Sequence, residues 1–459
     1  MSRDKSVHAV DEVLPLGQLC TYGLQHVLVM YSACIIVPLI LGAALHLPKE
    51  QLTLIINADL FAAGLATLVQ CAGNRFFGIR LPIMMGVTFA SVTPMIAIGV
   101  NPGLGLPGVY GAIIVSGLFG ILFAPVMGRL LRFFPPLVTG TVLLVIGISL
   151  MRVGIDWSAG GQPQLANGSP NPDYGNPVYL AISLFQLILI LGINRYAKGF
   201  IANIAVLLGV LVGFFIAFFR GDIVLDGIHQ TPWFSMITPF AFGLPKFDFV
   251  AIVSMCLVML VTMVESTGMF LALGKMVDRP TTRTSLVRGL RSDGLGAVLG
   301  GVFNAFPYTS FSQNIGLVTM TGVKSRYVCI AGALILIALG LFPKLAYIVA
   351  STPQYVLGAA GMVMFGMVML MGVRILSTVD FEQSRYNLLI VATSVGIGMI
   401  PMVAPRYFHH LPDWTRIFTE SGIVLSVCSA LILNILFNGL GDADEAEVSA
   451  ARAAALSDG

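Results

Sequence analysis

The chain has 459 residues, of which 57% are hydrophobic and only 10% are charged, with a net charge of +3. Soluble domains carry about a quarter charged residues, so this composition excludes a soluble protein and predicts a polytopic protein embedded in a lipid bilayer. The Lys and Arg residues lie in short loops without a long basic run, which excludes nucleic acid as a partner. The six cysteines have no metal-ligand spacing, so neither a metal nor another cofactor is expected.

Candidate membrane spans follow one another along almost the whole chain. The N-terminus, MSRDKSVHAVDEVLPLG, lacks the apolar stretch of a signal peptide, so the first span is expected to remain in the mature protein. Apolar segments long enough to cross a bilayer cover residues 16–45, 51–73, 107–127, 136–151, 178–193, 201–219, 248–274, 327–350, 355–373, 386–404 and 420–440. The Gly-rich residues 289–305 are also apolar enough. Residues 82–100 and 307–322 are too short or too broken for ordinary spans. We therefore predict an all-α protein of fourteen membrane segments.

The distribution of positive charge predicts how these segments are oriented. Lys and Arg favour one set of alternating loops, and this set faces the cytoplasm in membrane proteins. Both termini are then cytoplasmic, in a multi-pass protein of the plasma (inner) membrane. Residues 441–459, which are acidic and Ala-rich, are expected to form a flexible cytoplasmic tail.

The two broken segments occupy corresponding places, third and tenth of the fourteen, so the second seven segments form an inverted repeat of the first seven. Their sequences are similar: LPIMMGVTFASVTP (81–94) and FPYTSFSQNIGLVTMTG (306–322). Paired interrupted segments in two halves indicate the mid-membrane site of a secondary transporter. Non-helical backbone is tolerated at that depth only where it is enclosed by protein or lines a cavity.

Two carboxylates within or beside apolar segments are candidates for the site. Glu265 lies deep in the apolar run MCLVMLVTMVESTGMFLALG, where a charge must face the bundle interior or a wet cavity. It is predicted to carry a proton or to accept substrate N–H groups, with a structural carboxylate as the alternative. Asp293 is placed at the start of the ninth span, beside Arg288 and Arg291, where support of the site competes with an interfacial salt bridge.

Uncharged polar and aromatic residues complete the candidate site. Gln313 and Asn314 offer amide donors and acceptors that suit a ring with alternating N–H and C=O groups, and satisfying the broken backbone is the alternative role. The first break supplies Thr88 and Phe89, and Phe89 is suited to stacking on a flat ring. His26 is buried in the first span, as either a packing or a functional residue. We expect Asn57 and Asp59 in the second span to be structural.

The stretch QNIGLVTMTG (313–322) resembles the signature of the nucleobase–ascorbate transporter family, the nucleobase:cation symporters. The signature begins with Gln, Glu or Pro, then Asn, any residue and Gly, and after four more residues it ends with Thr and Arg, Lys or Gly. The matching positions are Gln313, Asn314, Gly316, Thr321 and Gly322. The Gln25-His26 pair, Glu265 and the Asp293-Gly294 pair match further family motifs in the same order, so the resemblance covers nearly the whole chain.

The resemblance implies a division into domains. Core segments 1–4 and 8–11 would cover residues 16–135 and 248–353, and gate segments 5–7 and 12–14 residues 136–247 and 354–440. Residues 1–15 would be a cytoplasmic tail. Segments 3 and 10 would be short strand–helix elements that meet at mid-membrane. Family members are typically homodimers whose core moves like an elevator.

By the same resemblance, Glu265 and Gln313 bind the base directly, Phe89 stacks on it, and Asn314, Asp293 and His26 support the site or proton coupling. Import of a purine base with a cation, most simply H⁺, is the implied activity. Thr88 favours uric acid over xanthine, because xanthine-type members tend to have Asn there. The alternatives are an anion carrier on the same fold or an integral-membrane enzyme. The chain contains no HExxH, GxSxG or P-loop motif, which argues against hydrolysis and ATP-driven transport.

Overall fold

The computed structural model describes residues 8–165, 168–382, 384–412 and 415–439. Within them, eight helices are long and apolar enough to cross a membrane. These are α1 (Leu16–Ala44), α2 (Lys49–Ala72), α4 (Gly105–Phe123, continued by short helical turns to Phe133), α6 (Pro136–Ser158), α7 (Pro177–Tyr196), α10 (Phe249–Met276), α15 (Gln354–Leu376) and α16 (Arg385–Val403). The fold is therefore mostly helical, as predicted.

Six further segments complete the fourteen. They are α9 (Ala205–Arg220), α11 (Arg283–Val302), α18 (Gly422–Asn438), the pair α13 (Arg326–Gly340) and α14 (Pro343–Ala350), and two strand–helix segments. The strand–helix segments are β1 (Met85–Val87) with α3 (Val92–Gly99) and β2 (Tyr308–Ser310) with α12 (Ser312–Thr321). Single-turn helices are α5 (Met127–Leu130), α8 (Phe200–Asn203) and α17 (Arg416–Thr419).

Two sequence predictions about helices were wrong in detail. The apolar run 327–350 is not one helix, because α13 and α14 meet at an angle of 78°. Pro343 stands at the first position of α14 and cannot donate the backbone hydrogen bond that would continue α13. The ninth span begins at Arg283, where the side chains of Thr282 and Ser285 form a capping box. Asp293 therefore lies in the middle of helix α11 and not at its start.

Helix packing repeats between the two halves of the chain. The fourth segment of the first half, α4, packs on α11 and α10 of the second half. Its counterpart in the second half, α13, packs on α2 and α1 of the first half. These contacts are exchanged copies of each other when α1, α2 and α4 correspond to α10, α11 and α13. Glycines permit both crossings, since a Cβ at Gly117 would lie 2.6 Å from the Gly294 oxygen, and one at Gly64 would lie 2.7 Å from the Ala333 oxygen. This exchange is the packing expected of an inverted repeat.

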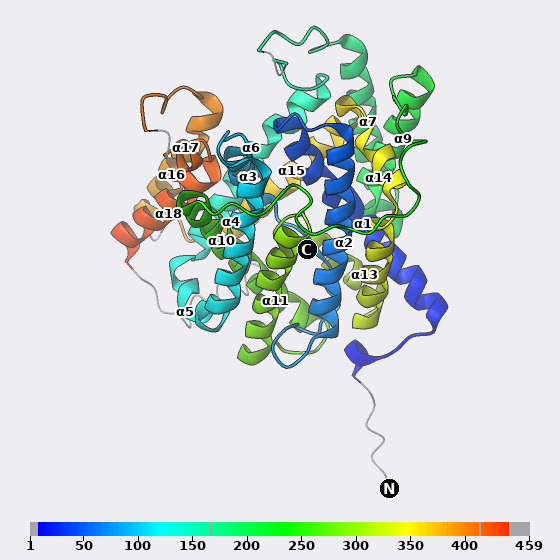
Figure 1. Ribbon diagram of the computed structural model, residues 1–459. Helices are drawn as coiled ribbons and strands as arrows, with labels where there is room; N and C mark the ends of the chain where they lie inside the picture. Colours follow the sequence, from blue (N-terminus) through cyan, green and yellow to red (C-terminus); the bar gives the residue numbers. More distant parts are fainter. Residues whose placement is uncertain (1–7, 166–167, 383, 413–414, 440–459) are drawn as a thin grey trace.

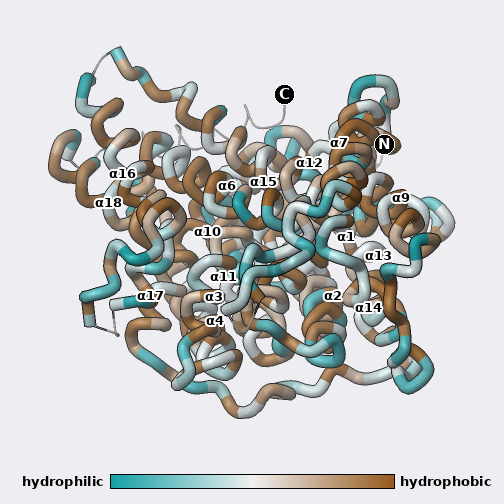
Figure 2. Tube along the Cα trace, turned by 90° about the horizontal axis from the view of Figure 1, so that it is seen from above, coloured by the Kyte–Doolittle hydropathy of each residue, from teal (hydrophilic) through white to brown (hydrophobic). Residues whose placement is uncertain are grey.

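Helices α6 and α15 are the fifth segments of the first and second halves, and they pack directly on each other. Helices α7, α9, α16 and α18 surround them. Apolar residues dominate the peripheral helices α9, α16 and α18, whereas polar residues gather in the connecting segments (Figure 2). The outer helices are also the least covered, and in α16 only 17% of the span is buried. An apolar, uncovered perimeter is the surface that a lipid bilayer requires.

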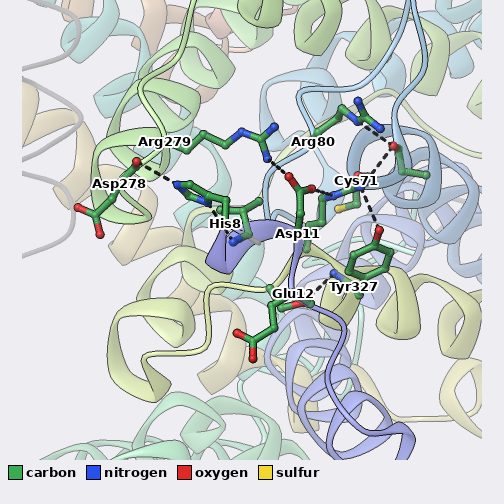
Figure 3. A network of polar contacts seen from close by, with 12 residues as sticks. His8, Asp11, Glu12, Cys71, Arg80, Asp278, Arg279 and Tyr327 are labelled. Atoms are coloured by element: carbon green, nitrogen blue, oxygen red, sulfur yellow. Dashed lines mark hydrogen bonds and ion pairs between the residues drawn. The ribbon is translucent and has the colours of Figure 1, made fainter. Parts of the chain in front are cut away.

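One face of the molecule is held together by the N-terminal segment, residues 8–12 (Figure 3). Asp11 accepts hydrogen bonds from Arg279, which follows α10, at 2.9 Å and from Arg326, at the start of α13, at 2.6 Å. Arg326 also donates to the carbonyl oxygens of Cys71 at 2.7 Å and Ala72 at 3.0 Å, where α2 ends. The N-terminal segment and the turns after α2, α10 and α12 therefore share one face, as the predicted topology requires.

The opposite face carries the other set of loops. The Lys49 amine, at the start of α2, donates to the Val224 carbonyl at 2.9 Å, and the Lys246 amine donates to the Gly103 carbonyl at 2.9 Å. The N-terminal segment lies at the bottom of Figure 1, and the connection between α6 and α7 lies at the top. Loops therefore alternate between two faces in the predicted order.

Candidate functional site

The two interrupted segments meet in a two-stranded antiparallel sheet at the centre of the protein. Met85 pairs with Ser310, Gly86 with Thr309 and Val87 with Tyr308. Two further backbone hydrogen bonds extend the pairing, from the Thr88 N–H to the Pro307 oxygen at 3.1 Å and from the Phe311 N–H to the Met84 oxygen at 2.9 Å.

Gly86 allows β1 and the residues that follow β2 to approach closely. A Cβ at this position would lie 2.5 Å from Cδ2 of Phe311. The short sheet brings the residues that follow β1 and those that follow β2 into one region, as the paired interruptions predicted.

Asn314 joins the second interruption to the first span. Its Nδ2 atom lies 3.0 Å from the backbone oxygen of His26 and 2.9 Å from Nδ1 of the same residue. A carbonyl oxygen can only accept, so the amide must present its NH₂ group, and Nδ1 then accepts the second hydrogen bond. His26 is consequently held as a neutral ring with its proton on Nε2. Both side chains are buried, with exposed fractions of 3% for His26 and 0% for Asn314.

Gln313 lies on the other side of α12. It is exposed, and its Oε1 atom accepts a hydrogen bond from the Ser312 hydroxyl at 3.2 Å. Gly316, one helical turn later, is also exposed, and a Cβ there would meet no atom within 4 Å. The face of α12 that carries Gln313 is therefore open, whereas the Asn314 face is sealed against α1.

Glu265 lies in α10, which contacts β2, α12 and the short helical turn after Thr88. Its side chain is partly exposed and has the Thr309 hydroxyl as a hydrogen-bonding neighbour. Thr309 in turn lies 3.3 Å from the Ser266 hydroxyl, oxygen to oxygen. This arrangement places a carboxyl group beside the paired strands, at the same level as the polar residues of β2.

Asp293 is fully buried in α11, and no interfacial salt bridge forms at this position in the described structure. Its Oδ1 atom accepts a hydrogen bond at 3.0 Å from Gln70 of α2. Gln70 also donates to the Gly289 oxygen at 3.2 Å and accepts from the Ile79 N–H at 3.1 Å. Asp293 therefore supports the structure behind the paired strands, joined to α2 and to the chain that enters β1.

Gln70 was not among the residues that the sequence singled out. The available signal was an uncharged polar residue in the last turn of an apolar span, a position that usually faces the interface. Ser266 and Thr309 were missed for a related reason, since hydroxyl groups are common in membrane helices and stand out only when the fold brings them together.

Thr88 and Phe89 occupy the turn after β1. Thr88 is 1% exposed, and its Oγ1 atom accepts a hydrogen bond from the Ala90 N–H at 3.3 Å, which caps the following turn. Phe89 is partly exposed and makes an edge-to-face contact with Phe365 of α15, with ring centroids 5.9 Å apart. The first interruption thus touches the helix pair α6–α15 through an aromatic side chain.

The last two signature residues end helix α12. The Thr321 hydroxyl donates to the Leu317 oxygen at 2.8 Å, and Gly322 adopts a left-handed conformation with φ of 67°. A glycine at this position accepts the positive φ without steric cost, which is the usual way to end a helix. Their position gives Thr321 and Gly322 a structural role.

A cavity of about 540 Å³ lies next to the end of α1. Residues of α1 and α3 line one wall, and residues of α6, α16 and α18 line the other. Together with the interrupted helices, the inverted repeat and the buried polar groups, this cavity is typical of a multi-pass membrane transporter.

Comparison with known proteins assigns the family. Residues 17–407 match the profile described as "Permease family". The chain belongs to this family, which is the nucleobase–ascorbate transporter family that the signature resembled, and its members are transporters and not enzymes. The chain is 52% identical to the uric acid transporter UacT of Escherichia coli, over 95% of this chain and 89% of the relative. It is 45% identical to the xanthine permease of Bacillus subtilis, over 95% and 97%.

Solved structures confirm the fold. The transmembrane domain of the cyanobacterial bicarbonate transporter BicA superposes with a TM-score of 0.60 at 17% identity, covering 92% of this chain and 97% of that domain. The murine anion transporter Slc26a9 in its inward-facing state also has a TM-score of 0.60, at 12% identity, covering 92% and 68%. At such low identity the likeness shows a shared architecture of core and gate helices and nothing about the substrate.

Proposed function

We propose that this protein imports a purine base across the plasma membrane, with uric acid as the favoured substrate and xanthine as the second. The relatives named for uric acid and xanthine transport, at 45–52% identity over 95% of the chain, support this assignment. The single structural observation that carries it is the pairing of β1 with β2, which brings together the elements that carry Glu265, Gln313 and the Thr88–Phe89 turn.

The roles of the residues follow from their exposure. Gln313 and Glu265 are accessible and offer an amide and a carboxyl group, which can pair with the alternating C=O and N–H groups of a purine edge. Phe89 is partly exposed and suits stacking on the ring. Asn314 has its amide hydrogens bound to His26 and its Oδ1 atom buried, so we assign it a role in supporting the site and not in direct contact with the base. Thr88 acts on the base mainly through the turn that it caps.

Coupling to H⁺ would be carried by Glu265, with Asp293 and His26 supporting the site. A carboxyl group that faces a membrane cavity can exchange between charged and neutral forms as substrate enters. We place the core at residues 16–135 and 248–353 and the gate at 136–247 and 354–440. The core then moves like an elevator against the gate, and two copies of the chain associate as a homodimer with cytoplasmic termini.

The test measures uptake of labelled uric acid and xanthine by cells that express the wild type, Glu265→Gln or Gln313→Ala. A hydrogen bond to a charged group contributes about 1.5–3 kcal/mol, so Glu265→Gln should lower uptake roughly 10- to 100-fold. Glu50→Gln, the same change at an exposed position at the start of α2, is the matched control and should transport normally.

Two outcomes would contradict the proposal. Uptake of both purines by Glu265→Gln at the wild-type rate, with an unchanged response to a pH gradient, would remove Glu265 from coupling. Wild-type uptake that is inhibited by bicarbonate or sulfate and not by unlabelled purines would favour the anion carrier. The same competition experiment therefore decides between the two substrate classes.

A further inference from the structure

A second buried acid, Asp59, forms a contact with the paired strands that the transport proposal does not use. Asp59 lies in the middle of α2 and is 1% exposed, and Tyr308 in β2 is 0% exposed. The Tyr308 hydroxyl lies 2.8 Å from Oδ1 of Asp59 and 3.1 Å from the backbone oxygen of Asp59. The hydroxyl therefore donates to two oxygen atoms of one residue and fixes the ring against α2.

The surroundings of Asp59 contain no positive partner. Among the described residues no Lys, Arg or His forms an ion pair with it, and its Oδ2 atom is buried without a hydrogen-bond partner. The titratable groups that face it are Tyr308 and Cys34 of α1. A charged carboxylate without a counter-ion is strongly unfavourable inside a membrane protein, whereas a protonated carboxyl group still offers Oδ1 as an acceptor. These surroundings favour the neutral acid.

Tyr308 is close to residues of both interrupted segments. It pairs with Val87, the residue before Thr88, and it precedes Gln313 by five residues. A sheet of two three-residue strands is marginal by itself and needs side-chain packing to hold its place. The ring packs beside Gly296 of α11, where a Cβ would lie 3.5 Å from Cβ of Tyr308.

We propose that Asp59 is a positioning residue that works as a protonated, neutral acid and anchors β2 through Tyr308. The anchor holds Thr88 and Gln313 at the spacing that the purine needs. Asp59 thereby differs from Glu265, which would change its charge during transport. This inference rests on the proposed function for its substrate, whereas the contact itself stands on the geometry above.

The decisive variant is Asp59→Asn, because an amide keeps the Oδ1 acceptor and cannot be ionised. It should retain uric acid uptake within about threefold of the wild type and keep the same acceleration by an inward pH gradient, while Glu265→Gln loses most of its uptake and the gradient response. Loss of uptake or of the gradient response in Asp59→Asn would overturn the proposal, since it would mean that the charge of Asp59 is used. Failure of Asp59→Asn to accumulate in the membrane would also overturn it.

Tyr308→Phe removes only the hydroxyl and tests the anchor. It should raise KM for uric acid about tenfold with a smaller change in Vmax, because the strands that orient the base are loosened while the moving parts remain. Asp59→Ala should give a similar rise, and the double variant should be no worse than the worse single variant, because both remove one contact. An unchanged KM in Tyr308→Phe would contradict the anchor.

Wild-type uptake separates this inference from the proposed function. Absence of purine uptake by the wild type refutes the proposed function, whatever the variants do. In that case the anchor is tested by cysteine accessibility, with Gln313→Cys in the wild-type background and in Tyr308→Phe. A changed rate of labelling at residue 313 supports the anchor, and an equal rate refutes it.

Discussion

The first interruption (residues 85–99) and the second interruption (residues 308–321) have the same architecture but different chemistry. In the first, Thr88 is buried as a cap, and α3 is mostly buried and mostly apolar. In the second, α12 exposes Gln313 on one face and buries Asn314 on the other. The inverted repeat therefore duplicates the backbone break, whereas the side chains of the two interruptions differ in polarity and exposure. In the proposed substrate site, the first interruption would supply a mostly apolar wall, and the second interruption would supply most of the polar groups.

Asn314→Leu should have the largest effect, because it acts on the half that carries the polar groups. The change leaves the His26 oxygen and Nδ1 buried without a donor, and each loss costs about 1–3 kcal/mol. Uric acid uptake should fall by roughly 100-fold at equal protein levels. Thr319→Val, on the exposed face of the same helix, is the control and should transport normally. Uptake by Asn314→Leu close to that of the control would refute the link to α1.

Phe89→Leu tests the wall that the first interruption provides. It keeps an apolar side chain but loses the aromatic contact with Phe365, and such contacts contribute about 0.5–1.5 kcal/mol. KM for uric acid should rise by up to about tenfold, with a small effect on Vmax. Phe123→Leu removes a stacked aromatic pair in α4, away from the site, and should leave KM unchanged. Equal KM values for the two variants would contradict stacking by Phe89.

Thr88→Asn tests whether the first interruption affects the choice of purine. Asn caps a helical turn as well as Thr does, so the turn should remain intact. The ratio of uric acid to xanthine uptake should shift toward xanthine by about tenfold or less, as expected for one changed contact in a pocket. Thr88→Ser keeps the hydroxyl and should preserve the ratio. If Thr88→Asn also preserves it, discrimination lies elsewhere in the site.

Asp11→Asn should have the smallest effect, and it tests how the N-terminal segment is joined to the turn after α10 and to the start of α13. Partial burial by itself raises the pKa of Asp11, but hydrogen bonds and charge from Arg326 and Arg279 outweigh it and hold the pKa below its ordinary value. Asp11 therefore stabilises the fold at neutral pH, above its ordinary pKa, and this contribution disappears as the pH falls through the lowered folded value.

At neutral pH, Asp11→Asn should lower stability by about 1 kcal/mol, a fall in Tm of about 2 °C. Below the folded pKa its melting curve should coincide with that of the wild type. Asp278→Asn breaks a more exposed ion pair with Lys324 and should not change Tm. A difference between Asp11→Asn and the wild type that persists unchanged in acid would rule out the ionic contact as its cause.

Much of the fold follows from hydrophobicity along the chain. Apolar runs of membrane length predicted the spans, and the paired interruptions at segments 3 and 10 predicted where the helices would break. The bend between α13 and α14 was missed because residues 327–350 are apolar apart from Lys344, and only Pro343 and Lys344 indicated a break. The position of Asp293 was misjudged because Arg288 and Arg291 suggested an interface, whereas the capping box already starts the helix at Arg283.

The sequence alone determined that this protein spans a membrane, repeats itself in inverted form and gathers polar residues in two breaks. These properties depend on local composition, since lipid rejects charge and free backbone wherever they occur. Only the tertiary structure decided which polar groups meet: Asn314 with His26, Gln70 with Asp293, and Tyr308 with Asp59. Each of these pairs joins residues more than 200 positions apart. Their meeting depends on how α1, α2 and α11 pack around the strands, which no local pattern encodes.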